Sequence, residues 1–136
     1  MTERPVHDGL FEVTAEELRL VGGWSPSSGR AHFPLLDACP YTGARDVERR
    51  LLSAEATLWA WTAVTAAPPG YRGAVPYGFG IVELVDERLR VVTRLTEPDP
   101  ARLSFGQLMV AVADVVGVDD DGRDVVSWAF APAATR

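Results

Sequence analysis

Lysine is missing from this chain, and all thirteen of its basic side chains are arginines. Without lysine, a lysine Schiff-base mechanism is excluded for this chain acting alone. Cysteine is almost as scarce, because the single residue Cys39 excludes a disulfide within the chain. Long apolar runs are missing too. No run approaches the roughly 20 residues of a membrane-spanning helix, and the first residues lack a signal-peptide pattern. We therefore expect a cytoplasmic protein without a membrane partner.

Basic charge is in deficit as well. Thirteen basic residues face nineteen acidic ones, which gives a formal net charge of −6. This balance offers no general attraction to a phosphate backbone, so nucleic acid is not an expected partner. The 136 residues are 47% hydrophobic, which is enough for one domain with a true core and a small appendage.

The sequence pattern of the N-terminal region is compatible with both helix and strand. Residues 1–14 are polar with a small apolar island, typical of a short helix or of an arm that packs elsewhere. Residues 14–17 fit a helix capping box, but the following ELRLV alternates like a strand and runs into two glycines. We predict a strand over about residues 17–21.

From residue 46 onward the chain is rich in β-branched and aromatic residues. Residues 46–53 and 56–66 are predicted strands, and they precede a loop of about ten residues, APPGYRGAVPYG. Two hairpins follow, one around Asp86-Glu87 and one around VDDDGR, with a turn at EPDPARL between them. These patterns name six segments, and from Val47 onward we expect a barrel of five strands. Five short strands with one long connection predict a mainly β fold with a small closed barrel of the OB type.

Residues 24–43 keep the spacing of a zinc ribbon without its sulfur. The segment has the form S-x-x-S-G, then F-P, then C-P-x-T-G, where a zinc ribbon has CxxCG and CPxCG. Ser25, Ser28 and Thr42 stand at thiolate positions, and Cys39 alone could bind a metal as a thiolate. We call residues 24–43 the knuckle. The sequence thus divides into an arm and degenerate knuckle over 1–45 and an OB-fold domain over 46–136.

A structural zinc site needs four donors from Cys, His or carboxylate, and hydroxyls are poor substitutes. His32 and Asp37 are the other possible ligands near Cys39, but their spacing matches no standard site. We therefore expect no zinc. The knuckle should instead be held by turn hydrogen bonds and by the packing of its large side chains, Trp24, Phe33, Leu35, Leu36 and Tyr41.

The order of short motifs along the chain resembles one family. The motifs are SPSSG, FP, CPYTG, TLWAWTAV, PPGY, PY, VEL and TRL, spread from Phe11 to about Pro132. None is specific alone, but their order and spacing resemble the rubredoxin-like zinc-ribbon plus OB-fold family catalogued as domain of unknown function thirty-five. This chain departs from the family pattern at the knuckle, where three of the four ligand positions lack sulfur.

The resemblance implies an accessory subunit and not an independent catalyst. Family members accompany thiolase-like or lipid-transfer-protein-like catalytic subunits in hetero-oligomers acting on acyl-CoA. The coenzyme A thioester is then a shared substrate, and no cofactor is bound tightly. Some relatives pair with an aldolase that shortens steroid side chains by retro-aldol cleavage, so that reaction, or a related C–C bond lyase or acyl-transfer reaction, is expected here.

Eight residues are candidates for ligand or partner contact. Trp59 and Trp61 lie two apart on a predicted strand, so they should share a face, as core filling or as a wall against ligand or partner. Arginines suit phosphate oxygens but are also common as solvated ion pairs. The candidates are Trp59, Trp61, Tyr71, Arg72, Pro76, Tyr77, Phe79 and Arg94, and Arg90 shares the phosphate argument.

No catalytic residue is predicted. His7 and His32 have no nucleophile in a recognisable context, and Cys39 holds a former ligand position. The run DDDGRD lacks EF-hand spacing and is interpreted as a hairpin turn. Two other functions remain open. OB barrels with exposed aromatics stack single-stranded nucleic acid, against which the charge argues, and the chain could bind acyl-CoA alone.

Overall fold

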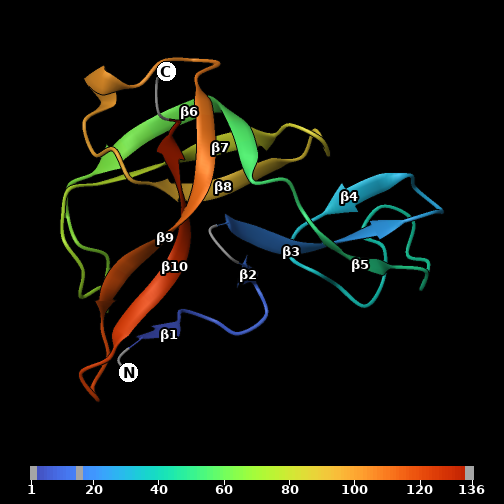
Figure 1. Cartoon of the computed structure of the whole chain (residues 1–136), viewed down its shortest axis with the longest axis horizontal. Helices are drawn as coiled ribbons and strands as arrows, with labels where there is room; N and C mark the ends of the chain where they lie inside the picture. Colours follow the sequence, from blue (N-terminus) through green and yellow to red (C-terminus); the bar gives the residue numbers. More distant parts are fainter. Residues whose placement is uncertain (1–2, 15–16, 134–136) are drawn as a thin grey trace.

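The computed structural model describes residues 3–14 and 17–133. Figure 1 shows a barrel with a smaller sheet beside it. The elements are β1 (Glu3–Pro5), β2 (Phe11–Thr14), β3 (Glu17–Ser25), β4 (Arg30–His32), β5 (Glu48–Leu51), β6 (Glu55–Val64), β7 (Tyr77–Leu84), β8 (Arg90–Leu95), η1 (Pro100–Arg102), β9 (Leu108–Val118) and β10 (Asp124–Pro132). None of the helical turns in these residues has the length or apolarity of a membrane span.

Strands β6 to β10 close into the barrel. β6 pairs antiparallel with β7 and with β9, and β7 pairs with β8. β10 runs antiparallel to β9 and closes the circuit through a parallel bridge to β8, where Phe130 faces Leu95. This five-strand closure confirms the mainly β, OB-type fold expected from the sequence.

Alternate side chains of these strands fill the barrel. In β7 and β8 every second residue is buried, as expected for strands with one face on a core. The side chains that are at most 1% exposed inside the barrel include Leu58, Val82, Leu84, Leu95, Met109 and Phe130. Burial of a large aliphatic or aromatic side chain stabilises the fold by about 1.5–3 kcal/mol, so this row of residues holds the five strands together.

The smaller sheet is built around β3. Its first half pairs with β2, and its second half lies between β4 and β5. The expectation that β3 ends at its glycines is wrong, because the strand continues through Gly22 and Gly23 to Ser25. A Cβ on Gly22 would meet the His32 carbonyl and Leu52, so the two glycines allow close approach of neighbouring chain. The predicted strand over residues 46–53 is present as β5, but it pairs with β3 and lies outside the barrel.

The two sheets share one core. Leu18 and Leu20 of β3 belong to the same buried cluster as the barrel residues. The rings of Phe11 and Phe33 also pack against Trp128 of β10, with centroids 6.4 and 5.5 Å away. β1 lies parallel to β10 (Figure 1), so the N-terminal segment is an arm, and the alternative of a short helix is wrong. The capping-box positions 15–16 lie outside the described residues.

A β-bulge interrupts β6 at Trp59. Leu58 is paired with Val82 and Ala60 with Ile81, so Trp59 is the extra residue. The bulge changes which positions face inward. Leu58 is fully buried before it, and Trp61 packs against the core after it, while Trp59 is exposed. The prediction that Trp59 and Trp61 share a face is therefore wrong.

The close approach of β6 and β7 after the bulge makes Gly80 sensitive to substitution. A Cβ on Gly80 would meet the Ala60 carbonyl oxygen and come within 3.0 Å of the Trp61 Cα. Both are backbone atoms of a paired strand and cannot move aside. We expect Gly80→Ala to lower the free energy of unfolding, measured by urea denaturation, by about 1–3 kcal/mol.

Gly117→Ala is the matched control. A Cβ there has its nearest neighbour at 3.5 Å, an ordinary contact in another barrel strand. Its unfolding free energy should stay within about 0.5 kcal/mol of the parent. Equal midpoints for the two variants would contradict the account of the bulge.

Candidate functional site

A cleft of about 390 Å³ lies between the loop of residues 65–76 and the turn that joins β9 to β10. In an OB barrel the loops after the first and fourth strands meet at this end, and they commonly bind ligands. The cleft is lined by Arg4, Gly70, Tyr71, Arg72, Val116, Gly117, Val118, Asp119, Asp120 and Val125. We call it the loop cleft.

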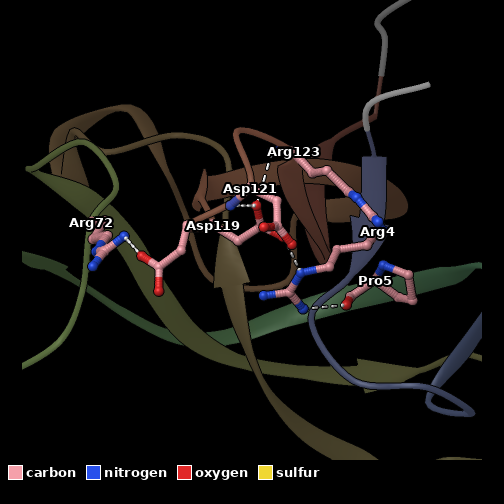
Figure 2. Close-up of polar contacts among 7 residues, drawn as sticks. Arg4, Pro5, Arg72, Asp119, Asp121 and Arg123 are labelled. Atoms are coloured by element: carbon pink, nitrogen blue, oxygen red, sulfur yellow. Dashed lines mark hydrogen bonds and ion pairs between the residues drawn. The ribbon is translucent and has the colours of Figure 1, made fainter.

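The charges in the loop cleft are paired (Figure 2). Arg4 Nε donates to Asp119 Oδ2, and Arg72 Nη1 donates to Asp120 Oδ1, each at 2.7 Å. The Arg72–Asp120 pair is widely exposed, so it contributes little to stability and can exchange with other ions. Arg72 therefore has a carboxylate partner here, and its predicted contact with ligand stays a prediction.

Asp119 organises the turn. Its Oδ1 accepts hydrogen bonds from the backbone N–H groups of Asp121 and Arg123, both at 2.9 Å (Figure 2). The Arg123 N–H and then the Arg4 side chain hold the pKa of Asp119 below its usual range. The run DDDGRD thus forms the expected hairpin turn, and its first carboxylate is committed to closing it.

Three of the predicted residues contact one another beside the loop cleft. The rings of Tyr71 and Tyr77 lie 5.1 Å apart, and the Arg94 guanidinium lies 4.4 Å above the Tyr77 ring. Arg94 Nη1 donates to the Tyr71 hydroxyl, and Nε donates to Asp114 Oδ2, both at 3.4 Å. Arg94 therefore fastens the loop to β8 and β9. Together with Arg72, which lines the loop cleft, four of the eight candidates therefore lie in this region.

The other four candidates lie elsewhere. Trp61 Nε1 donates to the Pro100 carbonyl at 3.0 Å, which ties β6 to η1 and supports the core-filling interpretation. Pro76 lies in a shallow apolar hollow with Pro98 and Pro100. Phe79 is 40% exposed on the outer side of β7, opposite Arg94 in the register.

Trp59 belongs to an exposed apolar surface that the sequence analysis largely missed. Its ring packs edge-on against Phe105 at 5.2 Å, and the Arg90 guanidinium lies 3.6 Å above it. Phe105 is 65% exposed. We define the outer patch as Trp59, Phe79, Val92, Phe105 and Leu108, all at least 36% exposed. The sequence signal for the outer patch is an apolar residue on the outward face of a strand, such as Val92. Which residues face outward is known only from the strand register.

The four degenerate ligand positions of the knuckle converge. Gly29 and Gly43 N–H groups donate to the carbonyls of Ser25 and Cys39, at 2.7 and 2.8 Å, which closes the two turns. The expected turn hydrogen bonds are thus present. Only part of the expected packing is present. Trp24 and Phe33 contact the core, whereas Leu35, Leu36 and Tyr41 are exposed.

Cys39 lies at the centre of this arrangement and is 2% exposed. Burial raises the pKa of its thiol, but hydrogen bonds from the side chains of Ser25, Thr42 and Ser28 and from the Tyr41 backbone outweigh burial and lower the pKa to about 6. Ser25 makes the largest of these hydrogen-bond contributions, and its buried hydroxyl has no other partner among the described residues.

The knuckle does not fit a zinc ion. One thiolate and three hydroxyls replace the four strong donors that a structural zinc site requires. Within residues 3–14 and 17–133, no three His, Cys, Asp or Glu side chains are grouped to hold a metal. The residues that converge here stabilise the thiolate form of a buried cysteine, and we derive no metal chemistry from them.

The two histidines show no catalytic arrangement. His32 is 3% exposed, and within the described part of the chain neither of its ring nitrogens has a hydrogen-bond partner. Burial lowers its pKa below the ordinary value of 6.5. His7 is exposed, with Nδ1 2.9 Å from the Asp8 carbonyl oxygen. Among the described residues, neither histidine has a hydrogen bond to Cys39 such as a base makes with a nucleophile.

The model of the ChsH2 C-terminal OB-fold domain matches residues 49–121, which is more than half of the chain. The chain belongs to this family. The match confirms the family to which the sequence motifs pointed, and it covers most of β5, all of β6 to β9 and most of the residues that line the loop cleft. It does not include the knuckle.

A solved structure described as the Ltp2-ChsH2(DUF35) aldolase is similar in fold to this member of the ChsH2 OB-fold family. The TM-score is 0.64 with 22% sequence identity, over 85% of this chain and 86% of that one. The likeness therefore extends beyond the barrel into the N-terminal sheet. A comparison with curated proteins gave no match.

Buried His32 should make stability depend on pH. The unfolded chain takes up a proton on this histidine as pH falls through about 6.5, and the folded chain does so only at lower pH. The contribution of neutral His32 is therefore complete above that value and is lost as pH falls below it. We expect the urea midpoint to fall between about pH 7 and pH 5.5, and His32→Leu to reduce the fall.

The measurement is made in a Cys39→Ser background, so that thiol titration does not add to the slope. His7→Gln is the control and should keep the full pH dependence. A slope that disappears with His7→Gln and persists with His32→Leu would overturn the assignment.

The thiol of Cys39 allows a second pH titration. As the chain has one cysteine, the ultraviolet absorbance of the thiolate reports this site alone. We expect a midpoint near pH 6 in the folded protein and one near the ordinary 9.0 in urea. Stabilisation by the thiolate is thus present at high pH and lost as pH falls toward 6. Thr42→Val should raise the midpoint, whereas Ser53→Ala in the barrel junction should not. A folded midpoint near 9.0 would contradict the hydrogen-bonded site.

Proposed function

We propose that this chain is an accessory OB-fold subunit of a heteromeric complex, in which a thiolase-fold partner of the lipid-transfer-protein type carries the catalytic groups. The observation that carries the proposal is the family membership, together with the fold shared with a component of an aldolase whose name joins two proteins, Ltp2 and ChsH2(DUF35). The same architecture serves many functions, so the site must support the assignment.

The described residues support a non-catalytic role. Cys39 is buried in the knuckle and His32 is buried without a partner, so neither group is presented to a substrate. Catalysis would then rest on the partner, and this chain would order the partner, close the substrate channel and share the acyl-CoA substrate. The reaction we propose is retro-aldol cleavage of a steroid side chain or a related C–C bond lyase or acyl-transfer reaction.

The outer patch is the surface we assign to the partner. Its apolar residues lie on the outward side of β6, β7 and β8 and around Phe105. Charges beside it are already paired, because Glu83 accepts from Arg88 and from Arg90 at 3.2 Å each. A partner could cover this face without leaving an unpaired charge in an apolar interface, which would be costly.

The two alternatives fit less well. A single-strand binder needs a basic groove, but the arginines of the loop cleft are paired with Asp119 and Asp120 in a chain of net charge −6. A stand-alone acyl-CoA-binding protein would need unpaired cations for the coenzyme phosphates in that cleft. Arg94, the third candidate cation, is paired with Asp114.

Co-expression tests the proposal. This chain and the thiolase-like protein encoded beside it should purify as one complex, and aldol cleavage or acyl transfer on an acyl-CoA substrate should require both. Full activity of that thiolase-like protein alone, with no association between the two, would sink the proposal. Turnover by this chain alone would favour the stand-alone alternative.

Substitutions in the outer patch test the surface. Phe105→Asp and Val92→Asp place a carboxylate where apolar contact is expected, and each should weaken the complex at least tenfold, or by about 1.4 kcal/mol, in calorimetry. Val115→Asp is the control, since Val115 is 49% exposed on β9 outside the patch. Equal weakening by all three variants would remove the outer patch from the interface.

A further inference from the structure

A second pocket, of about 250 Å³, lies between the N-terminal sheet and the turn that joins β7 to β8. We call it the arginine pocket. Its walls come from three separate parts of the chain. They are the knuckle, which includes the end of β3 and all of β4, then β5, and then the turn after β7. The lining residues are Trp24, Gly29, Arg30, Ala31, Tyr41, Arg50, Asp86, Glu87, Arg88 and Leu89.

Two guanidinium groups are held on aromatic rings in this pocket. The Arg30 guanidinium lies 4.0 Å above the Tyr41 ring, and that of Arg50 lies 4.7 Å above the Trp24 ring. The Tyr41 hydroxyl donates to the Ala31 carbonyl at 2.9 Å, which fixes the ring. Stacking uses the face of a guanidinium and leaves the N–H groups on its edge available to acceptors.

The carboxylates nearby do not neutralise these two arginines. Among the described residues Arg30 has no ion pair, and the Arg50 contact with Glu48 is long, at 3.9 Å, and exposed. Glu87 also lines the pocket, but its carboxylate accepts hydrogen bonds from the Ser53 hydroxyl at 2.6 Å and from the Ser53 N–H. Asp86 remains as the opposing charge, and Arg88 is paired with Glu83.

The arginine pocket therefore presents positive charge on a chain whose net charge is negative. The whole chain carries −6, and the arginines of the loop cleft are paired, whereas two stacked guanidiniums here keep donors without a close carboxylate. Guanidinium forks match the geometry of phosphate oxygens, and a tetrahedral phosphate offers acceptors to two forks at once.

We infer that the arginine pocket binds a phosphate or diphosphate group of a small molecule, held by Arg30 and Arg50. The inference is independent of the catalytic partner proposed above, and the isolated full-length chain is sufficient to test it.

Calorimetric titration of the full chain with inorganic pyrophosphate, at physiological salt, is the direct test. We expect saturable binding, with at least a tenfold loss of affinity in Arg30→Gln and in Arg50→Gln. Asp86→Asn removes the opposing carboxylate and should tighten binding, a gain that a misfolded variant cannot produce. Arg45→Gln is the control, because Arg45 is an exposed arginine outside the pocket.

Backbone and arginine Nε resonances followed by NMR during the same titration should shift at Arg30 and Arg50 and stay fixed at Arg45. Absence of saturable binding would overturn the inference. It would also be overturned if Arg45→Gln weakened binding as much as Arg30→Gln, or if the dicarboxylate malonate bound as tightly as pyrophosphate.

Discussion

The bulge at Trp59 is the constraint on which the barrel depends. β6 must pair with β9 at its start and with β7 along its length, so it has to bend while it serves two neighbours. A bulge supplies that bend and increases the local twist, as small closed barrels require. It also moves Trp61 onto the core side and leaves Trp59 outside. The inner packing and the outer patch therefore arise from the same extra residue.

The N-terminal sheet is part of the same folding unit. Leu18 and Leu20 join the barrel core, and Trp128 of β10 packs against Phe11 and Phe33 from the other side. A metal-bound ribbon can hold itself through its ligands, because metal binding adds free energy to folding. Without four donors the knuckle relies on the shared core, on its turn hydrogen bonds and on the buried Cys39. This explains how the zinc-ribbon frame persists when its ligands are absent.

Charge pairing differs among three regions of the surface. In the loop cleft the arginines and carboxylates satisfy one another, which keeps the loop of residues 65–76 ordered against β8 and β9. Beside the outer patch the pairs are internal too, so that face can be covered by an apolar partner. In the arginine pocket aromatic rings take the place of carboxylates as supports for Arg30 and Arg50, and the cationic edges stay free. The three regions thus suit three different kinds of contact.

Much of the fold was predictable because local patterns dominate it. Alternation in β7 and β8, the turn residues at Asp86-Glu87 and DDDGR, and the single long loop were enough to predict a small barrel, and the motif order pointed to the family. The pairing of β5 with β3 was not predictable. A short strand carries little information about which neighbour it joins, and here the close approach at Gly22 and Gly23 decides it.

The sequence by itself determined that this is a mainly β, lysine-free chain whose knuckle lacks three of the four thiolates of a zinc ribbon, because composition and ligand identity need no coordinates. Tertiary structure alone decided the functional surfaces. The bulge placed Trp59 and Trp61 on different faces, the register paired Val92 with Ile81 at an exposed position, and folding brought Arg30 and Arg50 to one pocket from positions twenty apart in the chain. Such placements depend on long-range pairing, and periodicity within a strand does not specify it.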